Sequence, residues 1–145
     1  MKYDSQKMFA VAIAARKLAY APYSQFPVGV CIFADDGQYY GGCNIENTSY
    51  PQGQCAEPTA IGNMIVHGAK KILATLVVTD TTHGVYPCGG CLQKLSEFTT
   101  PETEVFIANL DGIQLQKKFK ELFHSQFADV FTQIKNIKPA SNHAS

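Results

Sequence analysis

The sequence has no excess of charge of either sign, because twelve Lys and Arg residues balance twelve Asp and Glu residues. Proteins that bind nucleic acids usually carry a basic excess, so its absence argues against a polynucleotide substrate. No apolar run approaches the roughly 18 residues that a membrane-spanning helix needs, and residues 1–5 lack the apolar run of a signal peptide. We therefore expect no nucleic-acid partner, no membrane partner, a cytoplasmic location and a small, compact ligand.

An even set of cysteines is also missing, since the chain has five. A secreted disulfide framework would more naturally contain an even number. In the reducing cytosol, a Cys-x-x-Cys pair is typical of metal binding or redox chemistry. The chain contains one such pair, Cys88 and Cys91, and a further cysteine, Cys55, about thirty residues earlier.

The length of 145 residues and the hydrophobic share of 46% are ordinary for one globular domain with a real core. We expect a single domain over residues 1–128 and a polar C-terminal tail over residues 129–145. No internal repeat and no low-complexity segment interrupts the chain.

Hydrophobic periodicity and turn residues predict an α/β fold. A first helix is expected with Ser5 as its N-cap and an end near residue 18 or 19, and a hairpin is expected around the turn Asp35-Asp36-Gly37. The remaining expected elements are a helix over 55–67 with Ile61, Met64 and Ile65 facing inward, a strand over 72–79, a helix from Cys88, a strand over 104–108, a short strand after Gly112 and a helix over 116–123. This order predicts three layers, with helices on both faces of a mixed five-stranded sheet.

The three cysteines at the starts of two predicted helices form a candidate zinc site. Zinc prefers four ligands, so three thiolates leave one position for a water molecule. Helix N-termini favour negative charge, and adjacent crossover helices can bring their N-termini to the same edge of a sheet. Glu57 follows Cys55 by two residues. A metal-activated water beside a carboxylate that can carry protons is the chemistry of hydrolytic deamination.

Two other interpretations of the cysteines stay open. A structural zinc site would need a fourth protein ligand, for which the candidates are Cys31, Cys43, His67 and His83. The distance along the second helix excludes His67 as a partner of Cys55, whereas His83 lies in the loop before Cys88 and is not excluded. The second interpretation is a thiol redox pair formed by Cys88 and Cys91.

Four segments in this order resemble the cytidine deaminase family, in its small, homotetrameric, three-cysteine type. They are Tyr-Ala-Pro-Tyr-Ser-Gln-Phe-Pro-Val-Gly at 20–29, Gly-Cys-Asn-Ile-Glu-Asn-Thr-Ser-Tyr at 42–50, Cys-Ala-Glu at 55–57 and Pro-Cys-Gly-Gly-Cys at 87–91. The resemblance implies the family's three-layer α/β/α fold. It also implies zinc-dependent conversion of cytidine and deoxycytidine to uridine and deoxyuridine with release of ammonia, a reaction of pyrimidine salvage.

The resemblance also implies a role for each matching residue. Cys55, Cys88 and Cys91 would hold one Zn²⁺ per chain, and Glu57 would carry a proton from the activated water to the pyrimidine N3 and then to the departing amine. Phe26 would pack on the base, Asn44 and Glu46 would bind the ribose hydroxyls, and Tyr50 and Phe127 would complete the sites of neighbouring subunits in a homotetramer. Plainer alternatives stay open for the substrate contacts: a core aromatic for Phe26, a loop cap for Asn44, a solvated carboxylate for Glu46 and a hydrophobic anchor for Phe127.

The chain departs from the family pattern beside the metal ligands. Pro58 and Leu92 stand where the family usually has arginines, and Lys94 is a possible substitute. Fewer positive charges near three thiolates predict a less acidic activated water, and with it slower turnover of cytidine or a shifted preference. The alternatives for function are therefore an enzyme for another aminopyrimidine nucleoside, modified or of the blasticidin type, and a non-catalytic zinc protein with the same fold.

Overall fold

The computed structural model describes residues 2–130, so most of the predicted polar tail, 129–145, lies outside the described residues. The helices are α1 (Ser5–Arg16), α2 (Ala56–Val66), α3 (Gly89–Ser96) and α4 (Phe119–Leu122), and the strands are β1 (Val28–Ala34), β2 (Tyr39–Cys43), β3 (Ile72–Thr79), β4 (Glu104–Asn109) and β5 (Gly112–Lys118). Two 3₁₀ turns, η1 (Tyr50–Gln52) and η2 (Phe127–Asp129), complete the element order. Within the described part of the chain, no helix has the length and apolar character needed to cross a membrane.

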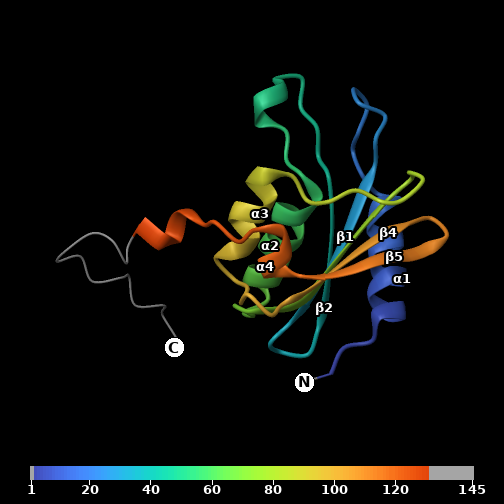
Figure 1. The fold of residues 1–145 in the computed structure, drawn as a ribbon. Helices are drawn as coiled ribbons and strands as arrows, with labels where there is room; N and C mark the ends of the chain where they lie inside the picture. Colours follow the sequence, from blue (N-terminus) through green and yellow to red (C-terminus); the bar gives the residue numbers. More distant parts are fainter. Residues whose placement is uncertain (1, 131–145) are drawn as a thin grey trace.

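The five strands form one mixed sheet in the order β2-β1-β3-β4-β5. β3 and β4 are parallel and are joined by the crossover helix α3, whereas the other neighbours are antiparallel. Figure 1 shows α1 on one face of the sheet and α2, α3 and α4 on the other. The predicted α/β class, the mixed five-stranded sheet and the three-layer arrangement are confirmed.

Each face of the sheet is covered by its own apolar cluster. Met8 and Ala12 of α1 pack against one face, and Met64 of α2 and Leu95 of α3 pack against the other. Successive side chains of a strand point to opposite faces, so a strand covered on both sides is apolar throughout. This explains the apolar runs of β1 and β3, in which all but the first residue of β1 and the second of β3 are buried.

Two glycines let helices approach the sheet closely from opposite sides. A Cβ atom on Gly29 in β1 would lie 2.0 Å from the carbonyl oxygen of Ala12 in α1. A Cβ atom on Gly42 in β2 would lie 2.3 Å from the backbone nitrogen of Ala60 and 2.5 Å from the carbonyl oxygen of Ala56, both in α2. The positions of both helices therefore depend on the absence of a side chain at these strand residues.

The first helix differs from its prediction at both ends. Its N-cap is Asp4, not Ser5, because the Asp4 carboxylate accepts hydrogen bonds from the backbone nitrogens of Gln6 at 2.9 Å and of Lys7 at 3.2 Å. The helix ends at Arg16, two or three residues early, and the following turn is tightened by the bond from the Leu18 nitrogen to the Ala15 oxygen at 3.0 Å.

Two further predictions on α2 and on the last helix are wrong. Ile65 is 43% exposed, since the inward stripe of α2 consists of Ala56, Glu57, Ala60, Ile61 and Met64. The last helix covers only Phe119–Leu122, because residues 116–118 continue β5 as partners of β4, with Gln116 opposite Phe106 and Lys118 opposite Glu104. The strand structure of residues 116–118 depends on pairing with β4, and helical periodicity in the sequence carries no information about that pairing.

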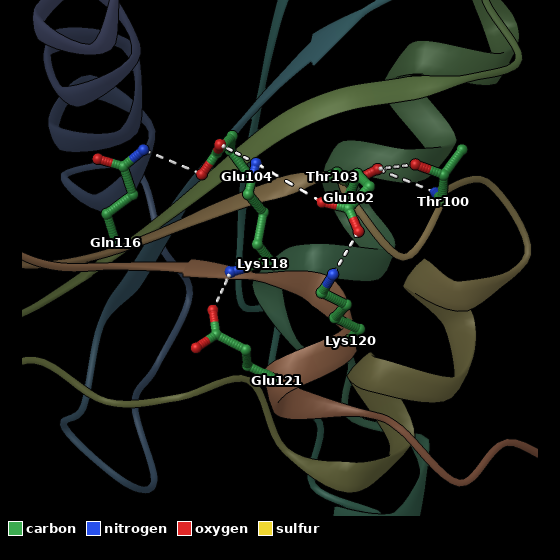
Figure 2. A network of polar contacts seen from close by, with 8 residues as sticks. All are labelled: Thr100, Glu102, Thr103, Glu104, Gln116, Lys118, Lys120 and Glu121. Atoms are coloured by element: carbon green, nitrogen blue, oxygen red, sulfur yellow. Dashed lines mark hydrogen bonds and ion pairs between the residues drawn. The ribbon is translucent and has the colours of Figure 1, made fainter.

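A polar network fixes the passage from β5 into α4 (Figure 2). The Lys118 Nζ lies 2.7 Å from the Glu104 carboxylate, which also accepts a bond from the Gln116 amide at 2.9 Å. The backbone nitrogen of Lys118 donates to the Glu121 carboxylate at 2.7 Å, and Lys120 pairs with Glu102. The network holds the start of α4, after which the chain leads away from the sheet (Figure 1).

Candidate metal centre and substrate site

The three predicted zinc ligands meet at the N-terminal ends of two helices. Cys55 is the N-cap of α2, Cys88 is the N-cap of α3, and Cys91 lies in the first turn of α3. Their Sγ atoms all lie within 4.8 Å of one another. Ligand sulfurs at about 2.3 Å from a tetrahedral zinc ion are about 3.8 Å apart, so a small closure of the cluster suffices for binding. The donor set and its spacing are therefore those of a zinc site with one position left.

The helix ends favour thiolates at this position. Helix N-termini carry a partial positive charge because their first backbone N–H groups lack helical partners, and in α3 the Cys91 N–H bonds the Cys88 sulfur. Burial raises the pKa of Cys88, but bonds from the Cys91 backbone and from the thiols of Cys91 and Cys55 outweigh it and bring the pKa below its ordinary value. Burial raises the pKa values of Cys55 and Cys91. These opposite directions favour the thiolate at Cys88 over that at Cys55 or Cys91.

Glu57 lies in the first turn of α2, beside the thiols, and is only 4% exposed. Burial raises the pKa of its carboxyl group, and a hydrogen bond with Cys91 acts in the opposite direction with less effect. A buried carboxyl group beside a metal site can hold and release a proton at a higher pH than an exposed glutamate. This is the property that a proton carrier in hydrolytic deamination needs.

No fourth protein ligand joins the cysteines among residues 2–130. Cys31 and Cys43 lie in β1 and at the end of β2, and burial raises the pKa of Cys31 to about 12, as expected of an apolar, protonated thiol. His67 follows α2 at its far end, where its Nδ1 contacts the Asn63 carbonyl oxygen at 2.8 Å. His83 does not belong to the group of converging ligands. The described residues therefore favour an open site over a closed structural one.

Asn44 and Glu46 hold the loop that carries Phe26. The Asn44 side chain accepts a bond from the Val28 nitrogen at 2.9 Å and donates to the Phe26 carbonyl at 3.0 Å. The Glu46 carboxylate accepts bonds from the backbone nitrogens of Tyr23 at 3.0 Å and of Ser24 at 2.9 Å. The Ser24 hydroxyl also donates to it, and this bond is the largest of the causes that lower the Glu46 pKa. Both predicted sugar-binding residues thus shape the loop as well.

Backbone pairing joins this loop region to the metal centre. Ile45 pairs with Tyr20 on one side and with Gln54 on the other, with both N–H to O distances between Ile45 and Gln54 at 2.8 Å. Gln54 immediately precedes Cys55, and its side chain donates to the Thr59 hydroxyl at 2.9 Å, which donates to the Cys55 carbonyl at 3.3 Å. Ile45, which lies between Asn44 and Glu46, is therefore held by backbone bonds next to the first zinc ligand.

A cavity of about 280 Å³ lies beside Glu46 and is lined by Tyr23, Ser24, Glu46, Asn47, Tyr50 and Gly53. The sequence prediction contained only Glu46 and Tyr50 of this set. Of the four residues that it lacked, Ser24 had a signal in the turn-rich run Pro22-Tyr23-Ser24, because serine in a turn commonly bonds nearby backbone. A larger groove, of about 960 Å³, opens at the other end of β3 and β4 and includes none of the predicted site residues.

The two residues predicted to act across subunits are exposed in the single chain. Tyr50 lies in η1 and is 74% exposed, with its ring 5.5 Å from that of Tyr23. Phe127 lies in η2 and is 71% exposed. Phe26 is 38% exposed, so it is not the plain core aromatic that the alternative required.

The two residues beside the metal ligands that depart from the expected pattern bring no charge to the cluster. Pro58 is the third residue of α2, where its missing N–H costs no helical bond. Leu92 is half-buried against the apolar cluster beneath α2 and α3. Lys94, the possible substitute, is exposed on α3.

Comparison with known proteins gives one consistent result. Residues 2–107 match the family model described as cytidine and deoxycytidylate deaminase zinc-binding region. The chain is 44% identical over 109 residues to cytidine deaminase from Sporosarcina psychrophila, covering 75% of this chain and 80% of that protein. It is 40% identical over 124 residues to the enzyme from Halalkalibacterium halodurans, covering 86% and 94%.

Solved structures agree with the sequence comparisons. The crystal structure of cytidine deaminase from Burkholderia pseudomallei superposes with a TM-score of 0.81 at 35% identity, covering 86% of this chain and all of that one. The match spans both the segment with Cys55 and Glu57 and the segment with Cys88 and Cys91. The chain therefore belongs to the cytidine and deoxycytidylate deaminase family, and it is a zinc-binding hydrolase of that family.

Proposed function

We propose that the protein deaminates cytidine and deoxycytidine to uridine and deoxyuridine, a step of pyrimidine salvage. The observation that carries the proposal is the meeting of three Sγ atoms within 4.8 Å beside the buried carboxyl group of Glu57. The relatives named cytidine deaminase support cytosine as the base of the substrate. The presence of Asn44 and Glu46 supports a substrate with an intact sugar. Three thiolate ligands, which a reducing compartment protects, support a cytoplasmic location.

In the proposed reaction, a C–O bond forms at C4 of the pyrimidine, the C4–N bond breaks and ammonia leaves. Zinc held by Cys55, Cys88 and Cys91 supplies a Lewis acid that makes water a nucleophile near neutral pH. Glu57 takes up the proton released from water, delivers it to N3 of the ring and then assists protonation of the leaving amine. Its raised pKa suits this exchange, because the carboxyl group must both accept and return a proton.

The substrate contacts have complementary tasks in this proposal. Phe26 offers its exposed ring to the base, and Asn44 and Glu46 offer their remaining hydrogen-bonding capacity to the sugar. The residues that line the cavity beside Glu46 include no Lys or Arg. A neutral nucleoside is therefore favoured over a nucleotide or a polynucleotide, whose phosphates would meet the Glu46 carboxylate.

The test is ultraviolet-monitored deamination, with metal analysis, of the wild type and Glu57→Ala. The substrates are cytidine, deoxycytidine, a modified cytidine and a blasticidin-type nucleoside. We expect one zinc per chain in both proteins and a loss of turnover of at least about 10²–10⁴-fold in Glu57→Ala. Retained zinc without turnover of any substrate by the wild type would support the non-catalytic alternative. Undiminished turnover in Glu57→Ala would refute the role of Glu57.

We also propose a homotetramer in which neighbours complete each site. Tyr50 and Phe127 leave large apolar surfaces exposed, as do Leu18 and Val66, each 79% exposed. A neighbouring subunit that covered Tyr50 and Phe127 would remove these two aromatic side chains from water. The measurement is molar mass by light scattering, followed by mixing of two inactive variants, Glu57→Ala and Phe127→Ala.

The mixing experiment tests the sharing of sites between subunits. A mixed assembly contains sites with an intact Glu57 from one subunit and an intact Phe127 from its neighbour. We expect part of the activity to return on mixing under conditions that allow subunit exchange. Activity that stays at the level of the separate variants would contradict sites built from two chains.

A further inference from the structure

One serine hydroxyl connects the proposed sugar-binding group to the proposed base-binding group. The Ser24 Oγ donates to the Glu46 carboxylate and accepts a bond from the backbone nitrogen of Phe26 at 3.0 Å. The backbone nitrogen of Ser24 donates to the other oxygen of the same carboxylate at 2.9 Å. Ser24 therefore contacts Glu46 twice and Phe26 once, although these residues are separated by 20 positions in the sequence.

The hydrogen-bonding capacity of Glu46 leaves a defined opening for a ligand. A carboxylate has about four lone-pair positions on its two oxygens. Oε1 is filled by the backbone nitrogens of Tyr23 and Ser24, and the Ser24 hydroxyl takes one position on Oε2. The remaining position is on Oε2, so the direction in which Glu46 can accept a sugar hydroxyl is set by the bond from Ser24.

The backbone next to Ser24 is held in an uncommon conformation. Gln25 has a φ of 55°, in the left-handed region that residues other than glycine rarely adopt. The bond from the Phe26 nitrogen to the Ser24 Oγ spans this residue and closes the turn. Removal of the hydroxyl would free the Phe26 nitrogen and the Glu46 Oε2 together.

We infer that Ser24 is a positioning residue that orients Glu46 for a sugar hydroxyl and sets Phe26 for the base through the same hydroxyl group. This inference rests on the proposed function of Glu46 and Phe26 as nucleoside contacts. Ser24 has no role in the chemical step, because its hydroxyl already donates to Glu46 and accepts from the Phe26 nitrogen. Its loss should therefore affect the binding of the nucleoside much more than the turnover of bound substrate.

The experiment compares the wild type with Ser24→Ala, Ser24→Thr and Ser96→Ala. Ser96 is a matched control, because its hydroxyl also donates to protein, to the Gln93 carbonyl at 2.6 Å, but on α3 away from the cavity. KM and kcat are measured for cytidine and 2′,3′-dideoxycytidine, and the dissociation constant of uridine is measured by calorimetry. The thermal unfolding temperature and the zinc content are recorded for every protein.

We expect Ser24→Ala to raise KM for cytidine and the dissociation constant of uridine about tenfold, the size of one charge-assisted hydrogen bond, with kcat near the wild-type value. The increase should be smaller for 2′,3′-dideoxycytidine, which keeps the base that Phe26 would contact but lacks the hydroxyls that Glu46 would accept. Ser24→Thr keeps a hydroxyl and should restore most of the binding. Ser96→Ala should bind like the wild type.

Two results would overturn the inference. One is unchanged KM and uridine affinity in Ser24→Ala. The other is an equal loss for both substrates that follows a lower unfolding temperature, since that would show general loosening of the loop. A wild-type protein without turnover of cytidine would refute the proposed function, while the uridine affinities of the four proteins would still decide the role of Ser24.

Discussion

Gly42 offers a direct test of how the fold positions the metal centre. The substitution Gly42→Ala would place a Cβ atom 2.3 Å from the backbone nitrogen of Ala60 and 2.7 Å from its Cβ, although 3.4 Å is the lower limit of ordinary contact. These atoms belong to the body of α2 and cannot rotate away. The whole helix would have to move outward by about 1 Å, and overpacking of this kind costs about 3 kcal/mol of unfolding free energy.

The same movement would displace the first zinc ligand and the residue proposed to carry protons. Cys55 caps α2 and Glu57 lies in its first turn, whereas Cys88 and Cys91 belong to α3 and would stay behind. A misplacement of about 1 Å in reacting groups can cost about 10²-fold in rate. We therefore expect Gly42→Ala to lose about that factor in kcat/KM for cytidine, even at temperatures where it is fully folded.

Gly29→Ala is the matched control from the other face of the sheet. Its Cβ atom would meet the Ala12 carbonyl oxygen at 2.0 Å, so it should destabilise the protein at least as much, but by displacing α1. Denaturant unfolding, metal analysis and steady-state kinetics on both variants separate stability from site geometry. Wild-type stability in Gly42→Ala, or an equal loss of activity in both folded variants, would refute this reasoning.

Two further predictions concern protons. Burial raises the pKa values of Cys55 and Cys91, so zinc must displace at least two protons when it binds. Its apparent affinity, measured by chelator competition, should therefore rise about 100-fold per unit between about pH 6 and pH 8. A slope of about tenfold per unit, which corresponds to one proton, would contradict this. Burial raises the pKa of Glu104, but bonds from Lys118 and Gln116 outweigh it and bring the pKa below its ordinary value. The contribution of Glu104 to the unfolding free energy is therefore present above about pH 4.3 and is lost as the pH falls through the lowered pKa. Glu104→Gln should therefore destabilise the protein by no more than about 1 kcal/mol at neutral pH, less in high salt and not at all in acid, as measured by denaturant titration.

Several elements could be predicted closely from local sequence. β3 runs over 72–79 as expected, because an apolar run bounded by polar residues has few alternatives to a strand covered on both faces. The starts of α2 and α3 at Cys55 and Cys88 were also expected from their flanking residues. The predicted start of the last helix, at residue 116, is wrong, because residues 116–118 carry a helical pattern but are held in β5 by β4 and by the ion pair with Glu104.

The candidate site divides in the same way. The identities of Cys55, Cys88, Cys91 and Glu57 indicated zinc-assisted deamination from the sequence alone, because cysteine spacing and a neighbouring carboxylate have few chemical uses. The roles of Phe26, Asn44, Glu46, Tyr50 and Phe127 stay predictions. Their geometry shows what a substrate would meet, but their action on a nucleoside awaits the kinetic experiments.

The sequence by itself determined the zinc chemistry, the layer order and most of the strands, since each depends on residue types within one segment. Only the tertiary structure decided that the thiols meet within 4.8 Å, that Gly42 sets the position of α2 and that Ser24 bridges Glu46 to Phe26. The physical reason is that distances between helices and the filling of lone pairs depend on partners far apart in the chain. Local sequence patterns identify the side chains that can react. Long-range contacts decide which lone pairs and ligand positions of these side chains remain available for a substrate or a metal ion.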